Sequence, residues 1–148
     1  MRHVPPYSLW IGNAGDVRSV AKLMEAGIRA VVDLAANEPV ASLPREIVYC
    51  RFPLLDGTGN ERWLLRAATS TISELLRDNV PTLVACSAGM SRSPALAAAA
   101  IARVSGRDPN ECLLACVASG PADVSPALWN DVVAVLRDLI VDTSRGKK

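Results

Sequence analysis

The stretch from Leu83 to Ala102, LVACSAGMSRSPALAAAAIA, restricts the possible folds of this chain more than any other. An apolar run ends at Cys86, small and polar residues continue to Ser93, and a proline then begins an alanine-rich apolar run. Proline is favoured in the first turn of a helix, so the pattern indicates a strand, a short loop and a helix. Because this helix is apolar almost all round, we expect it to lie at the centre of the domain.

Strand and helix patterns alternate along the rest of the chain. Runs rich in apolar and β-branched residues predict strands at residues 8–12, 28–35, 46–56 and 81–86. Periodic apolar positions predict helices at residues 16–27, 61–78, 108–119 and 125–140. Strands that alternate with helices indicate an α/β fold, with a central, largely parallel sheet of four to five strands flanked by helices on both faces.

Three of these elements carry more detailed expectations. The run at residues 28–35 is almost continuously apolar, which is typical of a strand buried on both faces of a sheet. Within the run at residues 46–56, the strand itself should stop near Pro53. The helix at residues 16–27 should bury one face, made of Val17, Val20, Ala21 and Met24.

Composition limits the class of protein. The chain has 148 residues, half of them hydrophobic, which predicts one domain over residues 1–148 with a core from about 8 to 141 and a frayed polar tail at 143–148. The net charge of +1 offers no basic groove for nucleic acid. The first residues lack the apolar segment of a signal peptide, and no apolar run is long enough to span a bilayer. We therefore expect a cytoplasmic monomer that binds neither nucleic acid nor a membrane.

The four cysteines are expected to be reduced in such a compartment. Cys112 and Cys116 lie four residues apart on a predicted helix, but no nearby histidine or second cysteine pair completes a metal site. We expect both to pack in the core, as free cysteines usually do. The only histidine, His3, is assigned no role.

The segment from Cys86 to Arg92 has the features of an oxyanion site. Ligands of parallel sheets bind beyond the carboxyl ends of strands, and helix N-termini attract anions. Small residues allow the backbone to curl and point its N–H groups inward, and Gly89 permits conformations that other residues resist. Arg92 adds a planar fork of donors that matches phosphate. The predicted cradle for a tetrahedral anion consists of Ser87, Ala88, Gly89, Met90, Ser91 and Arg92.

Cys86 is expected at the floor of this cradle. The inward N–H groups, the helix dipole and Arg92 all favour its thiolate form. A thiolate that faces a bound phosphate ester is placed to attack phosphorus. The Gly-Lys-Ser/Thr ending of the nucleotide-binding loop is absent, so that class of phosphate site is excluded.

Cys86, five residues, Arg92 and Ser93 resemble the signature of the cysteine-dependent protein phosphatases. The segment YCRFPLLDGTG resembles the one that carries the family's general-acid aspartate, here Asp56. LWIGNAGD and ADVSPALWNDVVAVL are similar to the opening strand and closing helix of the small dual-specificity members of the protein tyrosine phosphatase superfamily. The resemblance extends from about Ser8 to Ile140 and implies a protein tyrosine phosphatase-like fold.

The resemblance also implies a reaction that needs no metal or cofactor. Cys86 would attack the phosphorus of a phosphorylated protein, while Asp56 protonates the leaving oxygen and later activates water. Arg92 and the loop amides would stabilise the transferred phosphoryl group, and Ser93 would donate a hydrogen bond to the departing thiolate. The implied substrates are phosphotyrosine and, in addition, phosphoserine and phosphothreonine. The segment between Cys86 and Arg92 contains no Lys or Arg, which favours phosphoproteins or aryl phosphates over phosphoinositides.

Ala85 departs from the family pattern, because a histidine usually precedes the cysteine. This leaves a second hypothesis, a phosphate-binding pseudophosphatase that recognises phosphoproteins without turnover. A third, a sulfurtransferase or arsenate reductase, also uses a cysteine in an anion-binding loop. The upstream Asp56 is evidence against that third hypothesis.

Several residues near the predicted site keep two interpretations each. Asp33 can be a structural residue at a strand end or a second acid, and Asp56 can be a turn residue rather than an acid. Cys50 can form a disulfide with an oxidised Cys86 or remain free. Asn60 and Trp63 can line the mouth of the site, or the tryptophan can belong to the core.

Overall fold

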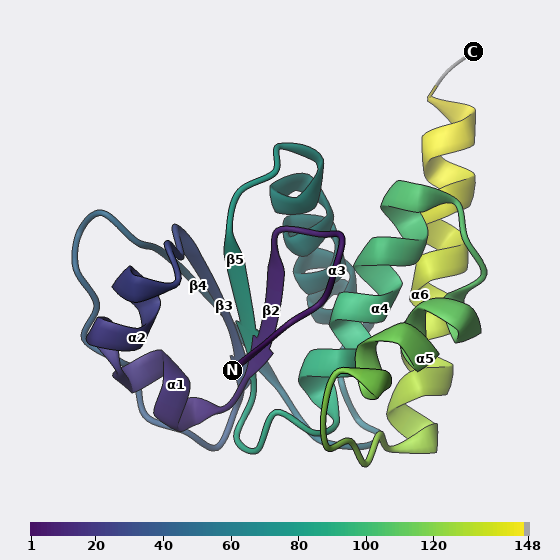
Figure 1. The fold of residues 1–148 in the computed structure, drawn as a ribbon. Coiled ribbons are helices and arrows are strands. Elements are labelled where there is room, and N and C mark those ends of the chain that lie inside the picture. The colour runs from purple at the N-terminus through teal and green to yellow at the C-terminus, as the bar shows by residue number, and fades with distance from the viewer. Residues whose placement is uncertain (147–148) are drawn as a thin grey trace.

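The computed structural model describes residues 1–146 of the chain (Figure 1). The strands are β1 (Arg2–His3), β2 (Leu9–Gly12), β3 (Ala30–Ala35), β4 (Val48–Leu54) and β5 (Thr82–Ala85). The helices are α1 (Ala14–Arg18), α2 (Val20–Glu25), α3 (Arg62–Arg77), α4 (Arg92–Ser105), α5 (Pro109–Ala118) and α6 (Pro126–Arg145). No helix among these residues has the length and apolar character needed to cross a membrane.

The five strands form one sheet in the order β1-β2-β5-β3-β4. The last four strands in this order are parallel, and only β1 runs antiparallel, to β2. This confirms the predicted fold class. Strand β5 is central, because Ala85 pairs with Gly12 on one side and with Asp33 on the other. The residue after β5, Cys86, therefore emerges between the carboxyl ends of two neighbouring strands.

Helices cover both faces of the sheet (Figure 1). On one face, α1 and α2 close a small core that contains Val17, Leu23, Val31 and Leu83. On the other face, α3 to α6 build the larger core, which receives Val32 and Leu34 of β3, Val84 of β5 and Leu9 of β2. Strand β3 sends side chains into both cores and all six of its residues are buried, as predicted.

Helix α4 is the central helix, as its composition predicts. Every residue from Arg92 to Ala102 is buried. It contacts α3, α5 and α6 as well as strands β2, β3 and β5. Alanine side chains allow these neighbours to approach closely, so one helix fills the space between the sheet and the outer helices. Cys112 and Cys116 of α5 lie in the same core, which confirms their predicted burial.

The prediction of one helix at residues 16–27 is wrong, because two short helices occupy this segment and bury a different set of side chains. Asn13 starts α1 earlier, because its side chain and that of Asp16 form a reciprocal capping box. Ser19 then leaves the helical region, with φ of −92° and ψ of 84°, and α2 begins in a new orientation. As a result Leu23 is fully buried, whereas the predicted core residue Met24 is 56% exposed.

One further boundary agrees with the sequence-based expectation and one differs. Strand β4 ends at Leu54, one residue after Pro53, which confirms the predicted stop near that proline. An edge strand tolerates the proline because one side of its backbone has no partner strand. The expected frayed tail instead continues α6 as far as Arg145, where Thr143 and Ser144 bond back to the helix backbone. Residues 147–148 of that expected tail lie outside the described residues.

Leu96→Ala should reveal the role of α4 in stability. Leu96 is fully buried, so its truncation leaves a cavity and should lower the free energy of unfolding by about 2–5 kcal/mol. The matched control is Leu114→Ala on α5, where the side chain is 66% exposed and the loss should stay within about 0.5 kcal/mol. Urea denaturation measures both, and equal losses would contradict a central position for α4.

Candidate active site

A pocket of about 460 Å³ opens at the carboxyl edge of the sheet. Four segments line it: the segment after β3, the end of β4 with the loop that follows it, the loop after β5 and the loop before α6. We call residues 55–60 the aspartate loop and residues 86–92 the cysteine loop. The lining residues are Ala36, Asn37, Leu54, Leu55, Asp56, Cys86, Ser87, Ala88, Met90, Ser91, Arg92 and Asp123.

The cysteine loop is held by backbone bonds to two other segments. The Ser87 carbonyl accepts the Ala14 N–H at 3.2 Å, and the Met90 carbonyl accepts the Asp123 N–H at 2.8 Å. Cys86 donates its own N–H to the Gly12 carbonyl at 3.3 Å, and only 2% of Cys86 is exposed. The cysteine is thus buried at the base of a loop whose carbonyls are turned toward the protein.

Gly89 makes the curl of the loop possible. Its φ is +71°, which places it in the left-handed region. A Cβ at this position would lie only 2.7 Å from the Gly12 carbonyl oxygen, so the loop packs directly against the backbone of β2. Both observations require glycine here.

The guanidinium of Arg92 is buried and held at three points. Its Nη1 donates to the Leu54 carbonyl at 2.8 Å and to Asn37 Oδ1 at 3.1 Å. Its Nη2 donates to Ser87 Oγ at 3.1 Å. The Nε is buried and has no hydrogen-bond partner among the described residues. Arg92 therefore lines the pocket in a fixed orientation with donor capacity left over.

Asn37 is a site residue that sequence reasoning missed. Its Oδ1 accepts from Arg92 and also from the Ser87 hydroxyl at 3.0 Å. One amide oxygen thus connects the segment after β3 to both ends of the cysteine loop. No motif marks Asn37, and the one available signal was its place just after a buried parallel strand, where ligand-binding residues gather.

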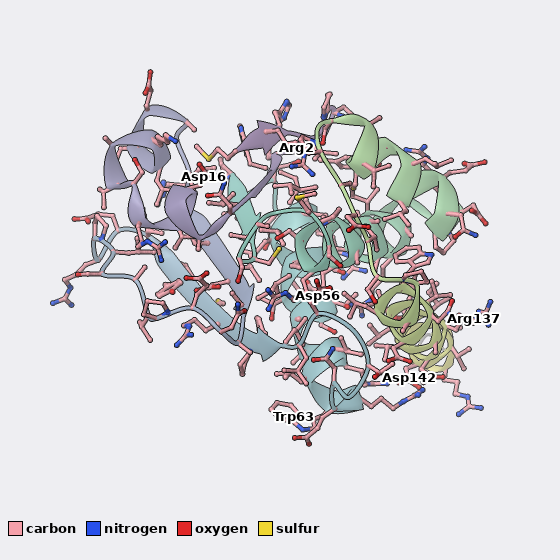
Figure 2. The ribbon with its side chains drawn as sticks, turned by 90° about the horizontal axis from the view of Figure 1, so that it is seen from below. Arg2, Asp16, Asp56, Trp63, Arg137 and Asp142 are labelled. Atoms are coloured by element: carbon pink, nitrogen blue, oxygen red, sulfur yellow. The ribbon has the colours of Figure 1, made fainter. Side chains whose placement is uncertain are left out.

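Asp56 reaches the pocket and contacts the cysteine loop. Its Oδ1 accepts the Ser91 hydroxyl at 2.6 Å, and Ser91 Oγ in turn accepts the Ser125 N–H at 3.0 Å. The carboxylate therefore lies in the same pocket as Cys86 and Arg92. Figure 2 looks onto this edge of the sheet and places Asp56 near the middle of the molecule.

Asn60 holds the aspartate loop rather than lining the pocket. Its side chain accepts the Leu55 N–H at 2.7 Å and donates to the carbonyls of Leu55 and Gly57. Trp63 is 61% exposed, donates to Glu61 at 2.6 Å and lies at the outer edge of the molecule in Figure 2. Neither the mouth of the pocket nor the core contains this tryptophan, so both interpretations of Trp63 are wrong.

Asp33 has a structural role. Its carboxylate accepts the Tyr49 hydroxyl at 2.7 Å and the Ala35 N–H at 3.1 Å, and Arg51 lies 3.6 Å away. Burial, together with the neighbouring Asp33, raises the pKa of Tyr49. All the bonds of Asp33 are made at the β3–β4 boundary and the residue does not line the pocket, so it is not placed to act as a second acid.

The cysteine and serine candidates occupy different positions. Cys50 of β4 and Val84 of β5 both pair with Val32 of β3, so the three residues form one row across the sheet. Cys50 and Val84 are two strand spacings apart, about 10 Å, which exceeds the Cα–Cα distance of ~7 Å that a disulfide tolerates. Cys86 lies beyond that row, so a Cys50–Cys86 disulfide does not fit. Ser93 is fully buried next to Arg92, and its Oγ has no hydrogen-bond partner within residues 1–146.

Ala85, which departs from the resembled pattern, lies outside the pocket. It is fully buried in the smaller core, between Gly12 and Asp33 in the sheet. The side chain of Ala85 is therefore not part of the wall around Cys86.

Comparisons with solved structures agree with this architecture. Human DUSP28 superposes with a TM-score of 0.83 at 22% identity, over 96% of this chain and 99% of the other. DUSP15 gives 0.78 at 22% identity, over 96% and 95% of the two chains. The human tyrosine phosphatase-like serine/threonine/tyrosine-interacting protein gives 0.76 at 18% identity, over 90% and 93%. At these identities the likeness establishes the fold.

Sequence comparison establishes the family. No curated protein sequence matches the chain. The family model described as "Dual specificity phosphatase, catalytic domain" matches residues 9–119, a span that contains Asp56 and the whole cysteine loop. This match, with which the fold agrees, shows that the chain belongs to the dual-specificity phosphatase family of the cysteine-dependent protein tyrosine phosphatases.

Proposed function

We propose that the chain is a single phosphatase domain that hydrolyses phosphotyrosine, and also phosphoserine and phosphothreonine, in proteins. The observation that carries the proposal is the pocket that holds Cys86, Arg92 and Asp56 together. These are a nucleophile, an anion anchor and an acid. Phosphoryl transfer to a cysteine requires these three groups together, and here they line one pocket at the N-terminus of α4.

The cysteine loop would bind the phosphate through its backbone. In a trans peptide the N–H points opposite to the carbonyl, so the outward carbonyls of Ser87 and Met90 aim the next N–H groups, those of Ala88 and Ser91, inward. The N-terminus of α4 adds its dipole. Arg92 supplies a positive charge in a fixed orientation, which matches the charge on phosphate oxygens.

In the first step, the Cys86 thiolate attacks phosphorus. A P–S bond forms as the P–O bond to the leaving group breaks. Asp56, protonated at this stage, gives its proton to the leaving oxygen, so a neutral alcohol or phenol departs. Arg92 and the loop N–H groups stabilise the charge that spreads over the transferred phosphoryl oxygens.

In the second step, the cysteinyl-phosphate is hydrolysed. Asp56, now a carboxylate, accepts a proton from water as the water oxygen attacks phosphorus and the P–S bond breaks. The unpartnered hydroxyl of Ser93 is available to donate a hydrogen bond to the departing thiolate. Inorganic phosphate then leaves, and Asp56 has regained the proton needed for the next cycle.

Charges around the pocket support phosphoproteins as the substrate class. Arg92 is the one cation among the lining residues of the pocket, and two carboxylates, Asp56 and Asp123, share its wall. A headgroup with several phosphates would meet repulsion from these carboxylates and no second cation. A single phosphate on a side chain needs only the cradle and one arginine.

The alternative function, phosphate binding without turnover, rests on Ala85 alone. The presence of Cys86, Arg92 and Asp56 in one pocket supports the active enzyme instead. The two functions differ in one measurable property, the release of phosphate from an ester.

Hydrolysis of para-nitrophenyl phosphate, in reductant and without added metal, tests the proposal. The wild type should turn over with a bell-shaped pH profile, and Cys86→Ser should lose turnover by a factor on the order of 10³ or more. Tungstate should still bind to Cys86→Ser, because the cradle remains. Tungstate binding by a wild type that shows no turnover at any pH would identify a binding module.

Asp56→Asn separates an acid from a turn residue. Phenyl phosphate has a poor leaving group that needs a proton, so its kcat should fall on the order of 10²-fold or more. Para-nitrophenolate leaves without protonation, so the first step with that substrate should change far less. Steady-state kinetics with both esters provide the comparison. Equal losses for the two substrates would assign Asp56 a structural role.

Gly89→Ala tests whether the backbone cradle binds the anion. The substitution strains the loop and forces a Cβ toward the Gly12 carbonyl, so tungstate affinity measured by calorimetry should be lost. Gly27→Ala is the matched control, because its φ is also +71° but open space surrounds it. That control should cost about 1–2 kcal/mol of stability and keep the tungstate affinity. Normal affinity in Gly89→Ala would contradict the cradle.

A further inference from the structure

Arg2 of β1 lies behind the cysteine loop, in a second cavity of about 270 Å³. This cavity is lined by Gly12, Asp16, Ala88, Gly89 and Ser119 among others, and it shares only Ala88 with the pocket that contains Cys86. Figure 2 shows Arg2 well separated from Asp56. Arg2 therefore contacts the loop from the side that faces away from a bound phosphate.

The guanidinium of Arg2 connects the cysteine loop to the end of α5. Its Nη2 donates to the Gly89 carbonyl at 3.2 Å, and its Nε donates to Ser119 Oγ at 3.0 Å. Ser119 is itself fixed, because its hydroxyl donates to the Cys116 carbonyl at 2.6 Å. The bond to the loop thus comes from a side chain that is anchored at a second point.

Gly120 provides the space that Arg2 needs. A Cβ at Gly120 would lie 2.4 Å from Arg2 Cδ and 2.9 Å from Arg2 Nε. The φ of Gly120 is not in the left-handed region, so backbone conformation does not demand glycine here. The reason for a glycine at this position is the passage of the Arg2 side chain.

The bond from Arg2 completes the orientation of the cradle. The carbonyls of Ser87 and Met90 accept from backbone N–H groups, whereas the carbonyl of Gly89 accepts from the Arg2 side chain. Fixing the Gly89 carbonyl outward turns the N–H of the same peptide unit, that of Met90, toward the pocket.

Arg2 also brings a positive charge close to Cys86. Burial lowers the pKa of Arg2, and attraction to Cys116 and Cys86 opposes that effect. A cation at this place attracts any negative charge that the loop holds. Ala85, the residue before the cysteine, supplies no charge at all.

We propose that Arg2 is a positioning residue for the phosphatase reaction proposed above: it fixes the Gly89 carbonyl and places a cation behind the cysteine loop. The inference rests on that proposed function. Arg2 touches neither the substrate nor the pocket, so it acts through the loop and through its charge. Arg2 lies far in sequence from the motif that begins at Cys86. It would then supply the cysteine loop with a hydrogen bond and a positive charge from outside that motif.

Arg2→Met tests the inference with three readouts. The kcat/KM for para-nitrophenyl phosphate and the affinity for tungstate should each fall roughly 10- to 100-fold, as expected for the loss of a charged hydrogen bond. The rate of Cys86 alkylation by iodoacetamide at a fixed pH should also fall, because the positive charge behind the loop is lost. The other charged groups around Cys86 are Arg92, Asp56 and Asp123, and all remain in the variant.

Two further variants separate position from charge. Gly120→Ala keeps the charge of Arg2 but displaces its stem, so kcat/KM and tungstate affinity should fall while the alkylation rate changes less. Arg2→Lys should give intermediate values, because an ammonium keeps the charge but cannot bond Gly89 and Ser119 as a fork. Arg45→Met, at an exposed arginine, is the control for loss of one positive charge and should match the wild type.

Wild-type values of all three readouts in both Arg2→Met and Gly120→Ala would overturn the inference. If Arg2→Met fails to fold, Gly120→Ala and Arg2→Lys still decide it. If the wild type does not hydrolyse the ester, the proposed phosphatase function fails, whereas tungstate affinity and alkylation continue to test Arg2. The two failures are thereby distinguishable.

Discussion

The buried guanidinium of Arg92 is the interaction on which the rest of the site depends. A cation removed from water is costly unless it is hydrogen-bonded, and here the partners of the two Nη atoms come from three separate segments. Leu54 closes β4, Asn37 follows β3 and Ser87 begins the cysteine loop. Arg92 also begins α4, the most buried helix of the fold. The buried charge therefore finds its hydrogen-bond partners only when the sheet is correctly assembled.

Small residues let other groups approach closely around the cysteine loop. Gly89 lies against the backbone of Gly12, and Gly120 leaves room for Arg2. The alanines of α4 bring that helix close to the sheet whose carboxyl edge carries the pocket. In each place a side chain is absent so that another group can approach.

The sequence predicts best those structural features that depend on residues close together in the chain. The cysteine loop and β3 were predictable because each has a local pattern, either a motif or a continuous apolar run. Asn37 and Arg2 have no such pattern, and their contacts with the cysteine loop arise only from the strand order that brings β1, β2 and β3 around β5. The break at Ser19 escaped prediction for a related reason: the capping box of α1 outweighed a helical periodicity that continued through the break.

The hydrogen bond between Ser91 and Asp56 has a stereochemical consequence. The two oxygens of a free carboxyl group are equivalent, and rotation exchanges them. Here the serine hydroxyl engages Oδ1, and that hydroxyl is itself oriented by the Ser125 N–H. The symmetry is thereby broken, and Oδ2 is the oxygen left without this serine contact. In the mechanism proposed above, the transferred proton would therefore have one oxygen to occupy, and the backbone before α6 sets which one it is.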